Sequence, residues 1–144
     1  EPCYCYRCPF GKAPATCGVP CAEDLDRAIR AAGPETVAAF GISSRVMLAI
    51  GGEKVAGIDP ARYAGRLAEV VGRVVKLATI GRMYLEGGAT AAAVMRHLRW
   101  DRLRVLEPVA FGLASLEVTG KPAPILTIKP GSYPWPDAVW RDDR

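Results

Sequence analysis

The chain has 144 residues, of which 50% are hydrophobic and 24% are charged, the composition of a folded domain rather than of a disordered or fibrous chain. This length supports one modest core and not two full-sized domains. Its uninterrupted apolar runs, such as Val46–Ile50, fall far short of the roughly 20 residues that span a bilayer, so we expect no membrane segment. The net charge of +4 mildly favours phosphate-bearing ligands, without a pattern typical of nucleic-acid binding.

The composition changes near residue 41. All five cysteines fall within the first 21 residues, and acidic groups slightly outnumber basic ones up to residue 41, whereas basic groups dominate afterwards. This change predicts two stretches of different origin, residues 1–41 and 42–144. The start at Glu1-Pro2-Cys3 includes neither an initiator methionine nor an apolar signal core, so we expect a cytoplasmic protein whose chain begins within a longer one.

The N-terminal stretch carries few periodic signals. Residues 1–20 are rich in Pro, Gly and Cys and predict an irregular loop. Apolar residues then recur at helical spacing at Leu25, Ala28, Ile29 and Ala32. They predict a short helix that ends at Gly33-Pro34. The apolar stretch Val37–Phe40 is a strand candidate, which Gly41–Ser44 ends.

From Arg45 onward, strand and helix signals alternate. Val46–Ile50 predicts a buried strand, and a helix follows from Pro60 to Leu77, with Asp59 as its N-cap. Further strands are expected at Arg82–Leu85, Leu103–Leu106, Phe111–Val118 and Ile125–Ile128, with a helix at Ala91–Leu98. This alternation predicts an α/β fold, with a mainly parallel sheet and flanking helices in a Rossmann-like three-layer arrangement.

A glycine turn, Glu86–Thr90, joins the strand at Arg82–Leu85 to the following helix. Glycines allow the backbone angles that converge N–H groups, and a helix N-terminus adds about half a positive charge. The turn therefore predicts a phosphate site in which Thr90 donates its hydroxyl or caps the helix. An ordinary strand-to-helix turn is the alternative, because neither the P-loop spacing nor a complete Gly-x-Gly-x-x-Gly is present.

Three stretches, Leu85–Met95, Leu103–Val105 and Thr127–Tyr133, together resemble the C-terminal nucleotide-binding domain of the four-carbon acid sugar kinase family. The resemblance covers about residues 44–141. In that family a Gly-Gly-Asp/Glu-Thr-Ala turn and a later Lys-Ser-Gly-Gly/Asn-Phe-Gly loop frame the ATP site. The matching positions here are Gly87, Gly88 and Thr90 on the first loop, and Lys129 and Gly131 on the second. The sequence departs from the pattern at Ala89, where the family has an acid, and at Pro130–Tyr133.

The resemblance implies ATP or ADP with Mg²⁺ as the ligand, since the family transfers the γ-phosphate to a hydroxyl of a small acid sugar. An acid-sugar-binding domain is missing, so we expect an incomplete protein that is not a competent kinase alone, with no catalytic residue assigned. A non-catalytic, degraded α/β domain is the alternative. Lys129 is expected either to reach a phosphate oxygen or to be a solvated strand end. The segment Tyr133–Pro136 is expected either to stack on a purine or to pack the chain end down.

The cysteine cluster permits two interpretations. The residues Cys3, Cys5, Cys8, Cys17 and Cys21 include one Cys-x₂-Cys pair, which fits a small zinc-binding module. We favour a second interpretation, because Cys3–Gly11, Cys17, Cys21-Ala22 and Gly33–Phe40 resemble an internal piece of class III pyridoxal-phosphate-dependent aminotransferases over about residues 2–40. Such a fragment is too short to hold a Schiff-base lysine and its surrounding domain. We therefore expect no PLP, no transamination and no dedicated metal site.

Overall fold

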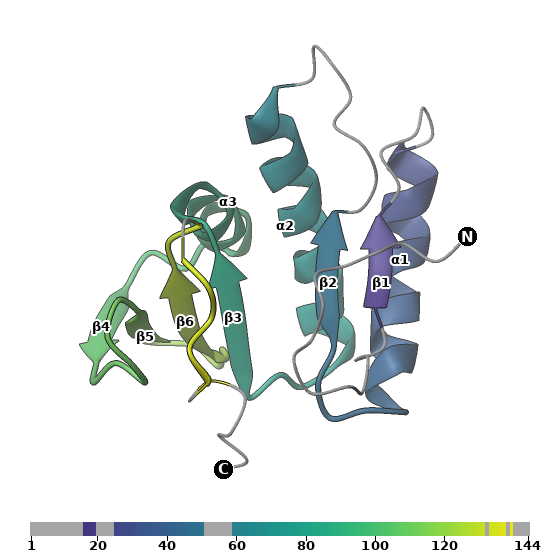
Figure 1. The fold of residues 1–144 in the computed structure, drawn as a ribbon. Helices are drawn as coiled ribbons and strands as arrows, with labels where there is room; N and C mark the ends of the chain where they lie inside the picture. The colour runs from purple at the N-terminus through teal and green to yellow at the C-terminus, as the bar shows by residue number, and fades with distance from the viewer. Residues whose placement is uncertain (1–15, 20–24, 51–58, 132, 138, 140–144) are drawn as a thin grey trace. The chain divides into compact units, whose positions relative to one another are not determined.

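Six strands and three helices follow one another in the computed structural model, which describes residues 16–19, 25–50, 59–131, 133–137 and 139 (Figure 1). In chain order they are β1 (Thr16–Val19), α1 (Leu25–Phe40), β2 (Met47–Ile50), α2 (Pro60–Leu77), β3 (Arg82–Glu86), α3 (Gly88–Leu98), β4 (Leu103–Leu106), β5 (Ala114–Val118) and β6 (Ile125–Lys129). The expected α/β class is confirmed. Within the described ranges, no helix is both long enough and apolar enough to cross a membrane.

The chain divides into two units, residues 1–78 and 79–144. In the first unit, β1 and β2 pair in parallel, and α1 packs against α2. The α2 helix has the bounds that the sequence predicts, because the Asp59 side chain accepts a hydrogen bond from the Ala61 N–H at 2.9 Å and Pro60 opens the first turn. The expected boundary at residue 41 therefore falls inside the first unit, whose elements lie on both sides of it.

Two local expectations for the N-terminal stretch are wrong. Part of residues 1–20 forms β1, since backbone pairing with β2 fixes a strand that shows no local periodicity. The α1 helix continues through Gly33-Pro34 to Phe40, so Val37–Phe40 is helical rather than a strand. Packing explains the continuation: Thr36 and Ala39 are buried, and a Cβ at Gly33 would lie 3.2 Å from the Cβ of Arg73 on α2. The free energy gained by close packing of α1 on α2 therefore exceeds the cost of the backbone hydrogen bond that Pro34 cannot donate.

The second unit is built on a four-stranded sheet in the order β3-β6-β5-β4. Only β3 and β6 pair in parallel, whereas β5 is antiparallel to both of its neighbours. The sheet is therefore mixed rather than mainly parallel. The reason lies in the connections, because the short segments 107–113 and 119–124 contain no helix and return the chain antiparallel.

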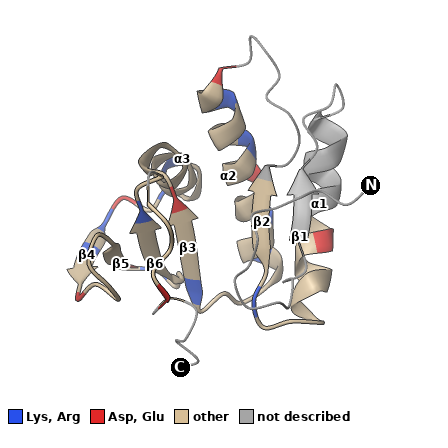
Figure 2. Ribbon diagram, viewed as in Figure 1, with Lys and Arg blue, Asp and Glu red and all other residues tan. Residues whose placement is uncertain are grey.

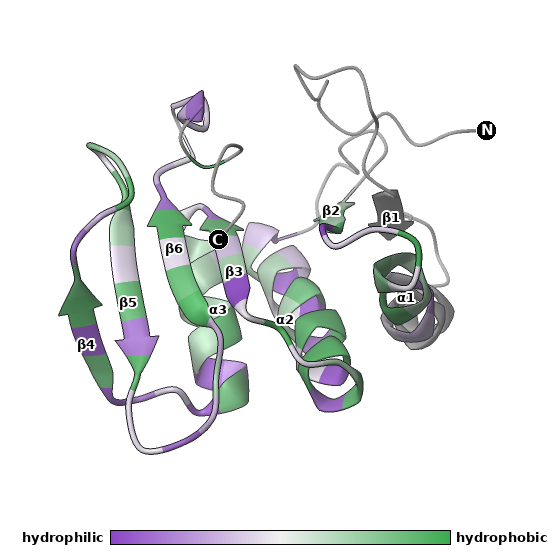
Figure 3. Cartoon of the chain, turned by 90° about the horizontal axis from the view of Figure 1, so that it is seen from below, coloured by the Kyte–Doolittle hydropathy of each residue, from purple (hydrophilic) through white to green (hydrophobic). Residues whose placement is uncertain are grey.

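The two faces of this sheet differ in what covers them. The α3 helix packs against β3 and β6, and the apolar residues buried on this side are Leu85, Ala91, Val94, Val118 and Leu126. Strand residues alternate between faces, so Tyr84, Glu86, Thr127 and Lys129 share the opposite face. There the chain after β6 turns back and crosses the sheet (Figure 1), while β6 itself is apolar over most of its length (Figure 3). The end of β3 thus leads into the N-terminus of α3, and the end of β6 leads into the segment that returns across the sheet.

Candidate functional site

The two loops that the sequence singles out lie side by side in the second unit. Because β3 and β6 are parallel, with Glu86 in register with Lys129, both loops leave the sheet at the same end. The backbone N–H of Gly87 donates to the Lys129 carbonyl at 2.8 Å and fastens one loop to the other. Figure 2 shows an acidic end of β3 beside a basic end of β6. The parallel pairing of β3 and β6 therefore brings the two loops to one end of the sheet.

Gly87 sets the start of α3. Its φ of 86° and ψ of 132° are angles that side-chain-bearing residues rarely adopt. The carbonyl of Gly87 accepts from the Ala91 N–H at 3.0 Å, so the helix begins at Gly88 and not at the expected Ala91. Thr90 consequently lies within the first turn and is not the N-cap, which is Gly87, with no side-chain capping hydrogen bond. Of the two roles expected for Thr90, capping is thus corrected, and donation of its hydroxyl to a phosphate stays a prediction.

The first turn of α3 presents backbone donors to solvent. Gly88 and Ala89 are exposed, and a Cβ at Gly88 would meet nothing within 4 Å. The N–H groups of Gly88, Ala89 and Thr90 lack intrahelical acceptors because they precede the fourth residue of the helix. Among the described residues, no hydrogen bond satisfies these three N–H groups. The turn is therefore an open set of donors at the positive end of a helix.

A pair of glycine variants tests this geometry. We expect Gly87→Ala to lower the free energy of unfolding by about 1 to 3 kcal/mol, because alanine must adopt an unfavourable positive φ. Gly88→Ala is the matched control and is expected to be neutral or slightly stabilising, since its Cβ enters open space in a helix. Urea unfolding followed by tryptophan fluorescence measures both. Equal effects of the two variants would contradict the assigned backbone conformation.

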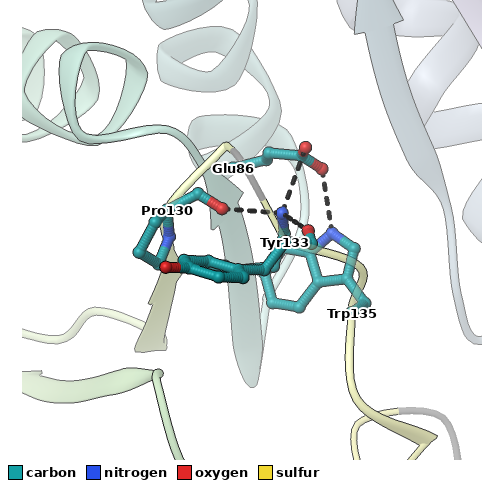
Figure 4. A network of polar contacts seen from close by, with 5 residues as sticks. Glu86, Pro130, Tyr133 and Trp135 are labelled. Atoms are coloured by element: carbon teal, nitrogen blue, oxygen red, sulfur yellow. Dashed lines mark hydrogen bonds and ion pairs between the residues drawn. The ribbon is translucent and has the colours of Figure 1, made fainter.

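Lys129 is the last residue of β6, and its buried side chain lies in a polar network with Glu86, Pro130, Tyr133 and Trp135, which Figure 4 labels. Its side chain is only 2% exposed. Its ammonium forms an ion pair with Glu86 Oε1 at 3.2 Å and donates to the carbonyl oxygens of Pro130, at 2.8 Å, and of Tyr133. The Trp135 ring lies against it, 5.3 Å from centroid to Nζ. Lys129 is therefore neither the solvated strand end nor the freely reaching cation that the sequence suggests.

The aromatic segment after β6 packs on the sheet. Trp135 Nε1 donates to Glu86 Oε2 at 3.0 Å, and the Trp135 ring meets Tyr84 edge-on, with centroids 5.9 Å apart. This is the packing alternative for Tyr133–Pro136, although Tyr133 itself remains 65% exposed. Gly131 is exposed in the turn that follows Pro130. Sequence reasoning missed Glu86 and Trp135 as partners of Lys129, and the signal available was the opposite charge at the ends of two strands expected to be parallel.

The metal prediction stays open. Cys3, Cys5, Cys8 and Cys21 lie outside the described residues, and only the backbone of Cys17 is described, in β1. In the described part of the chain, no group of three or more His, Cys, Asp or Glu side chains is placed to hold a metal ion. The zinc-module and aminotransferase-fragment interpretations of the N-terminal stretch therefore both remain predictions.

Solved structures share this fold, whereas no family model and no curated protein matches the chain. Two crystal forms of a domain of unknown function, DUF1537, from Bordetella bronchiseptica are 23% identical to it, with TM-scores of 0.67 and 0.65. Both are described as domain-swapped dimers with bound citrate. DUF1537 proteins belong to the four-carbon acid sugar kinase family.

The similarity is partial in length. It covers 88% of this chain but only 34% and 31% of the two solved chains, so the chain spans about a third of their length. Because residues 42–144 make up less than three quarters of the sequence, the match also takes in part of residues 1–41. The comparison therefore establishes a shared fold that extends across the expected boundary at residue 41.

Proposed function

We propose that the second unit binds the phosphates of ATP or ADP at the N-terminus of α3, as the nucleotide-binding part of a four-carbon acid sugar kinase-like protein. One observation carries the proposal: the open N–H groups of Gly88–Thr90 follow directly on Gly87, whose N–H donates to the Lys129 carbonyl at the end of β6. Backbone donors and the helix dipole together favour a phosphate group. The fold shared with DUF1537 structures supports the same assignment.

The residues at the turn fit a phosphate. Gly88 has no side chain to keep an anion away from the backbone, and a Cβ there would occupy open space at the donors. Ala89, in place of the family's acid, removes one carboxylate that would repel phosphate or hold a metal. The carboxylate of Glu86 is engaged by Lys129 and Trp135. We therefore expect Mg²⁺ to arrive on the nucleotide phosphates, and we expect weak affinity.

Phosphoryl transfer is expected to need more than this unit. The reaction depends on positioning the acceptor hydroxyl against the γ-phosphate and on neutralising charge there. The chain spans about a third of the solved chains that it resembles. We therefore assign nucleotide binding to this unit and place recognition of an acid sugar in a separate domain, without which the unit is not catalytically competent.

Calorimetric titration of the intact chain tests the proposal. We expect MgADP and MgATP to bind with dissociation constants in roughly the micromolar to millimolar range. Adenosine, which lacks phosphate, is the matched control and is expected to bind much more weakly, because the donors of Gly88–Thr90 recognise the anion. Absence of heat with MgADP at millimolar concentration would contradict the proposal and favour a non-catalytic α/β domain.

A further inference from the structure

We propose that Lys129 is a positioning residue and not a phosphate ligand. Together with Glu86 and Trp135 it forms a clamp that fixes the segment after β6 to the end of β3. The clamp itself rests only on the fold of the second unit. Its effect on ligand binding rests on the proposed function, because it acts on the turn at Gly87.

The ammonium of Lys129 is already engaged within the unit, by two hydrogen bonds and one ion pair. A protonated lysine carries three N–H donors and no acceptor. Three oxygens surround it: Glu86 Oε1 at 3.2 Å, the Pro130 carbonyl at 2.8 Å and the Tyr133 carbonyl. The Trp135 ring lies 5.3 Å from Nζ, and only 2% of the side chain is exposed. This cation is therefore paired and shielded from solvent without a phosphate.

Moving Lys129 toward a ligand would be costly. Its charge is balanced inside the unit by Glu86, which also accepts the Trp135 indole N–H through its second oxygen, at 3.0 Å. Withdrawal of the ammonium would leave two carbonyls without this donor and would break its ion pair with Glu86, whose carboxylate is half exposed. A phosphate at the α3 N-terminus must therefore find its donors elsewhere, on the open backbone.

The clamp residues Glu86 and Lys129 are the direct sequence neighbours of the two loops, so the contact between them also couples the loops. Glu86 immediately precedes Gly87, whose N–H donates to the Lys129 carbonyl at 2.8 Å. Lys129 immediately precedes Pro130 and holds the returning segment through the Tyr133 carbonyl, while Trp135 packs against Tyr84. Loosening the clamp should therefore disturb both the returning segment and the glycine that starts α3.

Amide and indole resonances of the intact, ligand-free chain provide the test. We expect Lys129→Met and Glu86→Gln each to shift the Trp135 indole N–H resonance, which is identified by its loss in Trp135→Phe. Both variants should also accelerate hydrogen exchange of the Val139 amide, which donates to the Pro136 carbonyl, by about tenfold. Lys121→Met is the matched control, because this exposed lysine contacts only carbonyls at the end of α3 among the described residues. It should change neither signal.

The direction in which MgADP affinity changes in the variants distinguishes a positioning role of Lys129 from direct phosphate binding. If Lys129 positions the loops, Glu86→Gln and Lys129→Met both weaken MgADP binding. If Lys129 binds phosphate directly, Glu86→Gln releases the ammonium and strengthens binding, and this result would overturn the proposal. An unchanged Trp135 resonance and Val139 exchange in both variants would also overturn it. If MgADP does not bind at all, the proposed function fails, while the two ligand-free signals still decide whether the clamp exists.

Discussion

Gly88→Val is expected to weaken MgADP binding by more than about tenfold while the fold survives. The isopropyl group would stand in the space through which a phosphate must approach the open N–H groups of α3. The protein itself loses little, because a Cβ at Gly88 meets nothing within 4 Å and the residue has no positive φ. Calorimetry measures the affinity, and urea unfolding checks that stability stays within about 1 kcal/mol of the parent.

Gly81→Val is the matched control for this variant. A Cβ at Gly81 would likewise meet nothing within 4 Å, but this glycine precedes β3 and so lies at the opposite end of the strand. We expect Gly81→Val to leave MgADP affinity unchanged. Equal loss of binding in both variants would show that valine acts through the fold rather than by obstructing the turn.

Leu126→Ala is expected to lower the free energy of unfolding of the second unit by about 2 to 5 kcal/mol, because it leaves a cavity in the core. Leu126 is 0% exposed and lies near the start of β6, between its register partners Met83 on β3 and Leu116 on β5. All three tryptophans of the chain lie after residue 78, so urea unfolding followed by their fluorescence reports on this unit.

Val105→Ala provides the contrast, since the Val105 side chain is 78% exposed on β4. We expect it to change stability by no more than about 0.5 kcal/mol. Comparable losses in Val105→Ala and Leu126→Ala would contradict the placement of β6 at the centre of the sheet and β4 at its edge.

The elements of the second unit were accessible from the sequence. Apolar runs separated by Gly and Pro located β3, β4 and β6 to within a residue at each end. In the first unit, the α2 helix was equally clear, because Asp59-Pro60 marks its start and an apolar stripe follows. The direction of the strands could not be predicted in the same way. The antiparallel pairing of β5 depends on connections without a helix, which the alternation of strand and helix signals alone does not reveal.

Tertiary contacts explain the errors in the first unit. Gly33-Pro34 is a sound local stop signal, yet α1 passes through it because Gly33 permits close packing on Arg73 of α2. Similarly, β1 exists through its pairing with β2, a partner that lies far along the chain. Local propensity carries no information on either contact.

The candidate site was predictable in position but not in detail. The sequence predicts both strands in a mainly parallel sheet, and β3 and β6 do pair in parallel, so the glycine turn and the loop after β6 leave the same end of the sheet. The burial of Lys129 was not expected, because it depends on Trp135 returning across the sheet to reach Glu86, a contact between residues far apart in sequence. The position of Thr90 within α3 depends in turn on the backbone angles of Gly87.

Binding of nucleotide phosphate at the N-terminus of α3 can be measured residue by residue. The most direct measurement follows the backbone amide resonances of the isotope-labelled chain during titration with MgADP. We predict that the amide resonances of Gly88, Ala89 and Thr90 shift most and reach saturation at the same MgADP concentration, and that adenosine does not shift them. Shifts confined to other parts of the chain, or no shift at millimolar MgADP, would contradict phosphate binding at this helix.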